Sequence, residues 1–168
     1  MILVGIGANL PSDHGSPLQT CEAALDALEN DGVGVVRRSR WYESAPVPAS
    51  DQPGFVNAVA VVRTKLAPPE LLALLHRIEA RFGRAGPGAR AARPNAARPL
   101  DLDLLAYHGA VRSGPEPPIL PHPRMGVRAF VLRPLKEVAP RWRHPVSGKT
   151  VSALIRALGN DQIARPLG

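Results

Sequence analysis

Apolar residues recur along this chain with two different periods, and the period identifies each element. A short apolar run over residues 2–7 is typical of a buried strand. Between Pro17 and Asn30 the apolar spacing is helical, with Ser16 as the expected N-cap and Pro17 at the first helical position. Residues 33–42 alternate and predict a second strand.

The same two periods predict a third strand, a second helix and a fourth strand. The valine-rich residues 55–64 indicate the strand, residues 68–82 carry a helical apolar stripe, and residues 100–107 alternate again. Residues 125–135 are apolar, but their spacing does not distinguish a helix from a strand. Residues 151–158 predict a short terminal helix. The order βαββαβ is that of a ferredoxin-like α+β fold, an antiparallel sheet with two helices packed on one face.

Length and cysteine content narrow the class of protein. We expect residues 1–168 to form a single domain with one sizeable core. No apolar run reaches the roughly 18 residues of a membrane span, and the amino terminus lacks the basic region of a secretory signal. The single cysteine, Cys21, excludes an internal disulfide and shares a helical apolar stripe with leucines. We therefore expect a buried thiol and a cytoplasmic location.

The net charge of +7 raises the hypothesis of a nucleic-acid partner. The aromatic content of 4% leaves few of the stacking side chains that single-stranded nucleic-acid binders use. We therefore expect no nucleic-acid partner, and a basic ferredoxin-like nucleic-acid-binding module stays as the alternative function.

Two carboxylates stand out in the fourth predicted strand. Asp101 and Asp103 are two residues apart, so their side chains share one face at a spacing of roughly 6.5–7 Å. Such a pair suits a divalent cation, because Mg²⁺ favours one or two carboxylates with water and phosphate oxygens. An edge strand with two solvated acids has the same pattern.

Six arginines lie between His76 and the start of this strand, against the single acid Glu79 in the same segment. They are Arg77, Arg81, Arg84, Arg90, Arg93 and Arg98. Guanidinium groups pair with phosphate oxygens in a bidentate fork. Residues 83–94 have no apolar period and predict a long mobile loop. The residues alone leave open whether this loop closes over phosphates or is a disordered connector.

Two familiar nucleotide motifs are incomplete. Gly5 and Gly7 follow strand residues, but Leu10 stands where a dinucleotide fingerprint needs its third glycine. Residues 147–150 resemble the end of a phosphate-binding P-loop, but Arg143 stands where its first glycine belongs. Neither motif predicts a nucleotide site here.

Five blocks in a fixed order nevertheless carry a resemblance to one family. They are Gly7-Ala8-Asn9-Leu10, Asp51 to Ala58, Arg77-Ile78-Glu79 with Gly83-Arg84, Arg98 to Asp103, and Leu120 to Met125 with Arg128 to Leu132. In this order and spacing they resemble the 6-hydroxymethyl-7,8-dihydropterin pyrophosphokinases of folate synthesis, over about residues 2–158.

The resemblance implies a ferredoxin-like kinase with mobile catalytic loops. Such an enzyme moves the β,γ-pyrophosphoryl group of ATP to the hydroxymethyl oxygen of the pterin and releases AMP. By similarity, Asp101 and Asp103 hold two Mg²⁺ ions, and Arg84 and Arg98 complete the catalytic residues.

The resemblance also implies the substrate contacts. The pterin is expected between Phe55 and Phe130, with Asn57 bonding its edge. The backbone that completes the slot comes from Ser44, Pro46 and Val47. The ATP contacts are expected from His76, Glu79, Arg84, Arg98, His122 and Arg128.

The chain departs from relatives at three places. It has Asn95-Ala96-Ala97 where many carry Trp-Gly-Pro before the same arginine. It has His76 where they often carry glutamine, and Gly86 where some carry another arginine of the mobile loop. We expect ATP and the pterin as small-molecule partners and a monomeric, cytoplasmic enzyme. A catalytically silent pterin-binding relative is the second alternative, against which the intact Asp101 and Asp103 pair argues.

Overall fold

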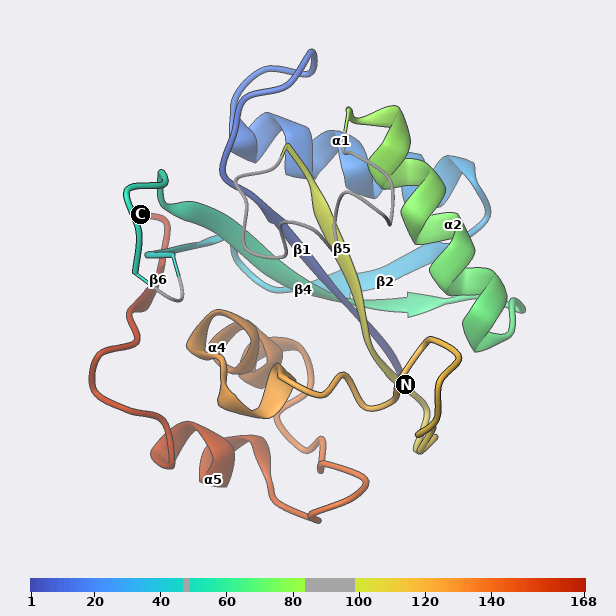
Figure 1. Cartoon of the computed structure of the whole chain (residues 1–168), viewed down its shortest axis with the longest axis vertical. Coiled ribbons are helices and arrows are strands. Elements are labelled where there is room, and N and C mark those ends of the chain that lie inside the picture. The colour runs from blue at the N-terminus through green and yellow to red at the C-terminus, as the bar shows by residue number, and fades with distance from the viewer. Residues whose placement is uncertain (47–48, 84–98) are drawn as a thin grey trace.

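The computed structural model describes residues 1–46, 49–83 and 99–168. Within these residues six strands form one sheet (Figure 1). The strands are β1 (Ile2–Ala8), β2 (Gly34–Arg38), β3 (Tyr42–Ser44), β4 (Phe55–Arg63), β5 (Asp101–Tyr107) and β6 (Ala164–Pro166). The helices are α1 (Pro17–Asn30), α2 (Pro68–Arg81), the 3-10 turn η1 (Met125–Val127), α4 (Ala129–Val138) and α5 (Val151–Arg156).

The strands form one antiparallel sheet, as the βαββαβ arrangement predicts. Its order is β5-β1-β4-β3-β6, and β2 also pairs with β4. Every pairing is antiparallel, and β1 and β4 pair along their whole length, from Ile2 opposite Val62 to Ala8 opposite Val56. Strand β1 lies between β4 and β5, so Asn57 of β4 and Asp101 and Asp103 of β5 flank it on its two sides.

Helices cover both faces of the sheet. Val4 and Ile6 of β1 pack into a core with α1 and α2, whereas the alternate residue Leu3 packs into a second core with α4 and α5. Figure 1 shows α1 and α2 together on one side of the strands and α4 and α5 on the other. The predicted pair of helices on one face is thus confirmed, and the second helical layer is an addition to it.

Helix α1 begins as its sequence predicts. The Ser16 hydroxyl accepts the Gln19 N–H (3.2 Å), and the Gln19 side chain accepts the Ser16 N–H (2.9 Å). This reciprocal pair satisfies two N–H groups that the first turn cannot pair internally. Cys21 on this helix is fully buried, as predicted, and its burial, with the nearby Glu22, raises the pKa of the thiol to about 12.

The prediction of one strand over residues 33–42 is wrong, because the chain forms two strands there. The β2–β4 register shifts between Val35 and Arg37, and β2 ends at Arg38. The buried Ser39 then pairs with β4 through its backbone N–H to the Val59 carbonyl (2.9 Å) and through its hydroxyl, which accepts the Val59 N–H (3.1 Å). The Ser39 hydroxyl thus replaces a backbone carbonyl as the acceptor at this point of the ladder, and the next strand, β3, begins at Tyr42.

The undecided stretch 125–135 is η1 followed by α4, which continues to Val138 with Pro134 inside it. The terminal helix ends at Arg156, two residues before its predicted end. Strand β6 was not predicted, since three residues show no measurable period. None of the described helices is long and apolar enough to cross a membrane.

Candidate active site

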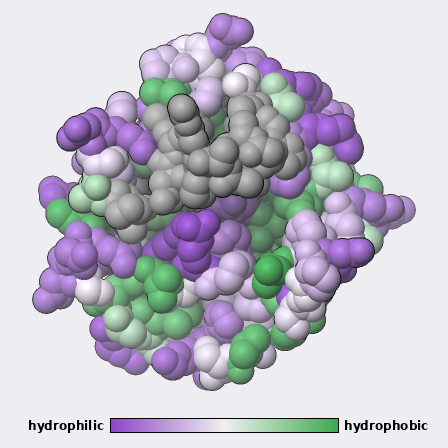
Figure 2. Space-filling model, viewed as in Figure 1, coloured by the Kyte–Doolittle hydropathy of each residue, from purple (hydrophilic) through white to green (hydrophobic). Residues whose placement is uncertain are grey.

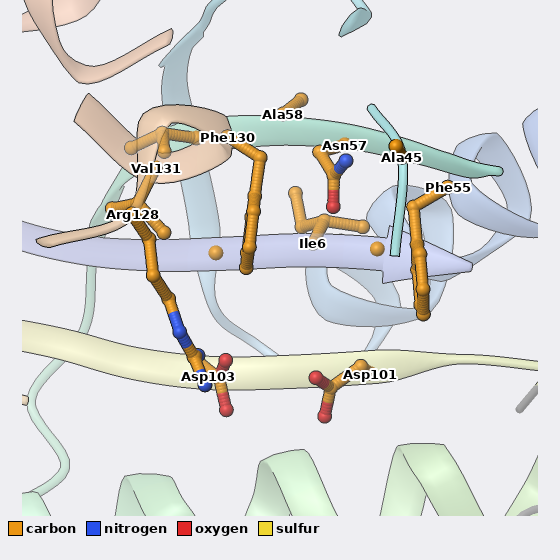
Figure 3. A pocket seen from close by; sticks show the side chains of 13 residues that line it. Ile6, Ala45, Phe55, Asn57, Ala58, Asp101, Asp103, Arg128, Phe130 and Val131 are labelled. Carbon is orange, nitrogen blue, oxygen red and sulfur yellow. The ribbon is translucent and has the colours of Figure 1, made fainter. Parts of the chain in front are cut away.

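A pocket opens on the sheet face that carries α4. It encloses about 620 Å³, its open mouth included. Its floor comes from the middle of β1, the first half of β4 and the start of β5, and its wall from the start of α4 (Figure 3). Its described lining residues are Gly5, Ile6, Gly7, Ala45, Phe55, Asn57, Ala58, Val59, Asp101, Asp103, Arg128, Phe130 and Val131. In the space-filling view, hydrophilic side chains gather near the centre of the molecule, with apolar side chains on both sides (Figure 2).

Asp101 and Asp103 both face this pocket, as the alternation of the strand predicts. Both are half-buried, while Leu102 and Leu104 between and beyond them turn to the opposite core. Figure 3 shows the two carboxylates side by side along β5. No third carboxylate, histidine or cysteine joins them into a larger metal-binding group within the described residues. Two carboxylates with open space beside them fit Mg²⁺, which keeps water and substrate oxygens as its other ligands.

Gly5 and Gly7 line the same pocket from β1 and place no side chain beside the carboxylates, a role that the incomplete fingerprint motif did not suggest. They lie opposite Asp103 and Asp101 in the β1–β5 register. A Cβ atom on Gly7 would stand 2.9 Å from the Asn57 side-chain oxygen, closer than real Cβ atoms come. The two-residue spacing of these glycines in a strand was the available signal, because it places both on the face of the aspartates.

Two aromatic rings bound the pocket, as the resemblance implied. Phe55 lies at the start of β4 and Phe130 in the first turn of α4, and both are half-buried. Figure 3 shows the rings facing each other across the space above Ile6 and Asn57. The arrangement is a slot open to a flat ligand, since aromatic faces stack on planar rings.

Asn57 lies at the base of this slot in a fixed orientation. It is 6% exposed, and its amide nitrogen donates to the Ser44 hydroxyl at 2.7 Å. Ser44 is therefore behind Asn57 and is not among the residues that line the pocket, whereas Ala45 is. Pro46 is half-buried without lining the pocket, and Val47 lies outside the described residues.

Arg128 enters the pocket from the junction of η1 and α4. Its guanidinium carbon lies 5.4 Å from the centre of the Phe130 ring. Figure 3 shows the side chain extending across the pocket mouth toward Asp103. A cation, two carboxylates and an aromatic slot thus meet in one pocket.

His122 stands near this charged group as a neutral ring. Burial, helped by Arg128 and Arg124 and opposed by Asp101, lowers its pKa to about 4. Its Nδ1 accepts the Arg124 N–H at 3.2 Å, so the neutral ring carries its proton on Nε2. His122 is therefore a hydrogen-bond donor at neutral pH, which suits an anionic partner.

The predicted nucleotide residues on α2 lie apart from the pocket lining. Glu79 is 2% exposed and accepts the Leu102 N–H at 3.0 Å. It thus binds the outer edge of β5, and His76 lies half-buried one turn earlier on the same helix. Arg84 and Arg98 lie outside the described residues, so the predictions for them are not addressed by this geometry.

Comparison with known proteins gives one consistent result. Residues 3–140 match the sequence model of the 7,8-dihydro-6-hydroxymethylpterin-pyrophosphokinase family. The chain is 39% identical to a 2-amino-4-hydroxy-6-hydroxymethyldihydropteridine pyrophosphokinase of Synechocystis sp., over 91% of this chain and 73% of that protein. It is 37% identical to the enzyme of the same name from Pseudomonas aeruginosa, over 98% and 95%.

A solved structure agrees at the level of fold. The HPPK-DHPS triple mutant of Plasmodium falciparum superposes with a TM-score of 0.68 at 14% identity. The match covers 92% of this chain and 43% of that one.

Proposed function

Because the chain belongs to the 7,8-dihydro-6-hydroxymethylpterin-pyrophosphokinase family, we propose that it transfers the β,γ-pyrophosphoryl group of ATP to the hydroxymethyl oxygen of 6-hydroxymethyl-7,8-dihydropterin and releases AMP. The observation that carries the proposal is that one pocket holds both an aromatic slot and a pair of carboxylates. A flat acceptor and a metal-bound triphosphate can therefore meet there.

The pterin occupies the slot between Phe55 and Phe130. Stacking on two ring faces and a planar amide at the base suit a heterocycle with a donor and acceptor edge. The bond from Asn57 to Ser44 supports this role, because it leaves the amide oxygen of Asn57 to accept from the ligand. The exposed Ala45 beside the slot offers backbone groups to the same edge.

Asp101 and Asp103 hold two Mg²⁺ ions, with water and phosphate oxygens as the remaining ligands. When bound, the ions neutralise charge on the triphosphate and lower the pKa of the acceptor hydroxyl. The two glycines of β1 support this assignment, since Gly5 and Gly7 lie opposite the carboxylates and place no side chain next to them.

The remaining polar residues bind the phosphates and keep them in line with the acceptor. Arg128 neutralises charge at the pocket mouth, and His122 donates through Nε2 without adding a charge. Arg84 and Arg98, which lie outside the described residues, stay a sequence-based prediction for phosphate binding. Positioning and charge stabilisation are what such a transfer asks of a protein, which supplies no covalent nucleophile.

The nucleotide role of His76 and Glu79 stays a prediction. Glu79 has a further role that its hydrogen bond supports, because it satisfies an edge N–H of the strand that carries both aspartates. Replacing it removes a buried acceptor and leaves the Leu102 N–H unpaired.

A product analysis tests the proposed reaction. The purified protein is mixed with Mg·ATP and 6-hydroxymethyl-7,8-dihydropterin, and the nucleotides are separated by chromatography. We expect AMP to appear in equal amounts with the pterin pyrophosphate and only when the pterin is present. ADP would indicate a different kinase, and pterin binding without nucleotide turnover would indicate a silent relative.

A further inference from the structure

The turn that presents Arg128 lacks a cap of its own. Arg128 is the N-cap residue of α4, with an extended backbone (φ −116°, ψ 116°), and its side chain makes no capping hydrogen bond. Its carbonyl already accepts the N–H groups of Val131 and Leu132. The first N–H groups of a helix need partners from outside the helix, so another residue must hold this turn.

Gln162 does so from the C-terminal segment, with both ends of its amide. Its side-chain oxygen accepts the Ala129 N–H at 2.9 Å, and its side-chain nitrogen donates to the Val127 carbonyl at 2.8 Å. These two backbone groups belong to the residues on either side of Arg128. One amide thus fixes the peptide before Arg128 and the peptide after it.

The segment that carries Gln162 is itself anchored to the other side of the slot. Two residues later the chain enters β6, where Ala164 pairs with Ser44 of β3. Ser44 is the residue that orients Asn57. Ala164 also shares a small buried cluster with Ala129, against which Phe130 packs. Gln162 lies outside residues 3–140, the part that matches the family.

We propose that Gln162 is a positioning residue of this active site, which sets Arg128 and Phe130 against the slot by holding the backbone on both sides of Arg128. The role rests on the proposed function of the pocket. It acts through the backbone at residues 127 and 129 and requires no contact between Gln162 and a substrate.

The test compares three variants of the full chain. Q162A removes both hydrogen bonds. Q162E keeps an acceptor for the Ala129 N–H but loses the donor to the Val127 carbonyl. Q19A is the matched control, because Gln19 also caps a helix start through its side-chain oxygen, on α1 across the sheet from the pocket.

Binding and local exchange are measured together. We expect Q162A to weaken binding of 6-hydroxymethylpterin, followed by its fluorescence, about tenfold, which two hydrogen bonds of ordinary strength allow. We expect the Ala129 amide hydrogen to exchange faster in Q162A, and Q162E to recover part of the affinity. We expect Q19A to bind the pterin as the unchanged protein does, although its melting temperature is no higher than that of Q162A. A general loss of stability would then not account for weaker pterin binding in Q162A.

Two results would overturn the proposal. Unchanged Ala129 exchange in Q162A would show that the amide does not hold the turn. Faster exchange with unchanged pterin affinity would show that the turn does not position the site. Failure of the proposed function appears separately, as absence of AMP with the unchanged protein, and leaves the Ala129 exchange readout in place.

Discussion

At the scale of single residues, the site depends as much on missing side chains as on present ones. Gly7 leaves room for the Asn57 amide, and the Asn57 amide is oriented by Ser44. The sequence pointed to Asp101, Asp103, Phe55, Asn57 and Phe130 through the resemblance and the alternation of strands. It did not point to the glycines, because their pattern first suggests a loop motif and gains its meaning only from the register with β5.

Replacing Gly7 tests this packing. In G7A the new methyl group would stand 2.9 Å from the Asn57 oxygen and push the amide away from Ser44. We expect the KM for the pterin to rise about tenfold and the free energy of unfolding to fall by about 1–3 kcal/mol, as overpacking commonly costs. Steady-state kinetics and urea unfolding measure the two effects.

G5A is the matched control on the same strand face. The atoms nearest to its methyl group would be those of the Leu105 side chain, at 3.4 Å, which is an ordinary van der Waals contact. We expect a smaller rise in the KM for the pterin than in G7A. Equal pterin kinetics in the two variants would refute the steric account of Gly7.

At the scale of elements, α4 is the part whose position decides the site. Gln162 holds its first turn, and Glu137 holds its last turn by accepting from the Arg40 guanidinium (2.8 Å) and from the Tyr42 hydroxyl. Both restraints join α4 to the β3–β6 side of the sheet. The apolar pattern of residues 125–135 could not reveal these restraints, because the apolar period of a helix is the same whichever residues its polar groups contact.

The Glu137 cluster predicts a specific loss of stability in acid. Burial opposes ionisation of Glu137, but the hydrogen bonds from Arg40 and Tyr42 outweigh it, so its pKa lies below the ordinary value of 4.5. The stabilisation is therefore complete above about pH 4.5 and is lost as the pH falls through the folded-state pKa. We expect E137Q to melt at a lower temperature at pH 7 and to show a flatter decline of melting temperature below pH 4.5.

Melting curves between pH 3 and pH 7 measure this difference. E22Q is the control, because Glu22 is an exposed carboxylate on α1 outside the cluster. An acid decline of the same steepness in E137Q and in the unchanged protein would show that Glu137 does not carry the effect.

At the scale of the whole molecule, one sheet separates two helical layers, and the site lies on the face that α4 and α5 cover. The sequence predicted the order βαββαβ and the layer of α1 and α2, since their stripes and caps are local. The split of residues 33–42 and the addition of β6 were not predicted, because both depend on pairing with β4 and β3 and leave no period of their own. The C-terminal segment is thus the least predictable part and lies next to the active site.

The same organisation places α2 and its predicted nucleotide residues away from the pocket. Helix α2 packs along β5 from the other core, so Glu79 binds the strand edge rather than the pocket. A resemblance assigns a role to a residue from its place in a motif, whereas the fold shows on which face of the sheet that residue lies.

In the proposed reaction, Asp101 and Asp103 are the acidic pair at which pyrophosphoryl transfer takes place. The most direct measurement is AMP formation by D101N and D103N, with D26N as a control on the exposed face of α1. We expect kcat to fall by at least about 10³-fold in both pocket variants, since each loses a charge that a metal-assisted transfer needs, with unchanged melting temperature and with full activity in D26N. AMP formation in D101N and D103N within a few fold of the unchanged protein would contradict the claim.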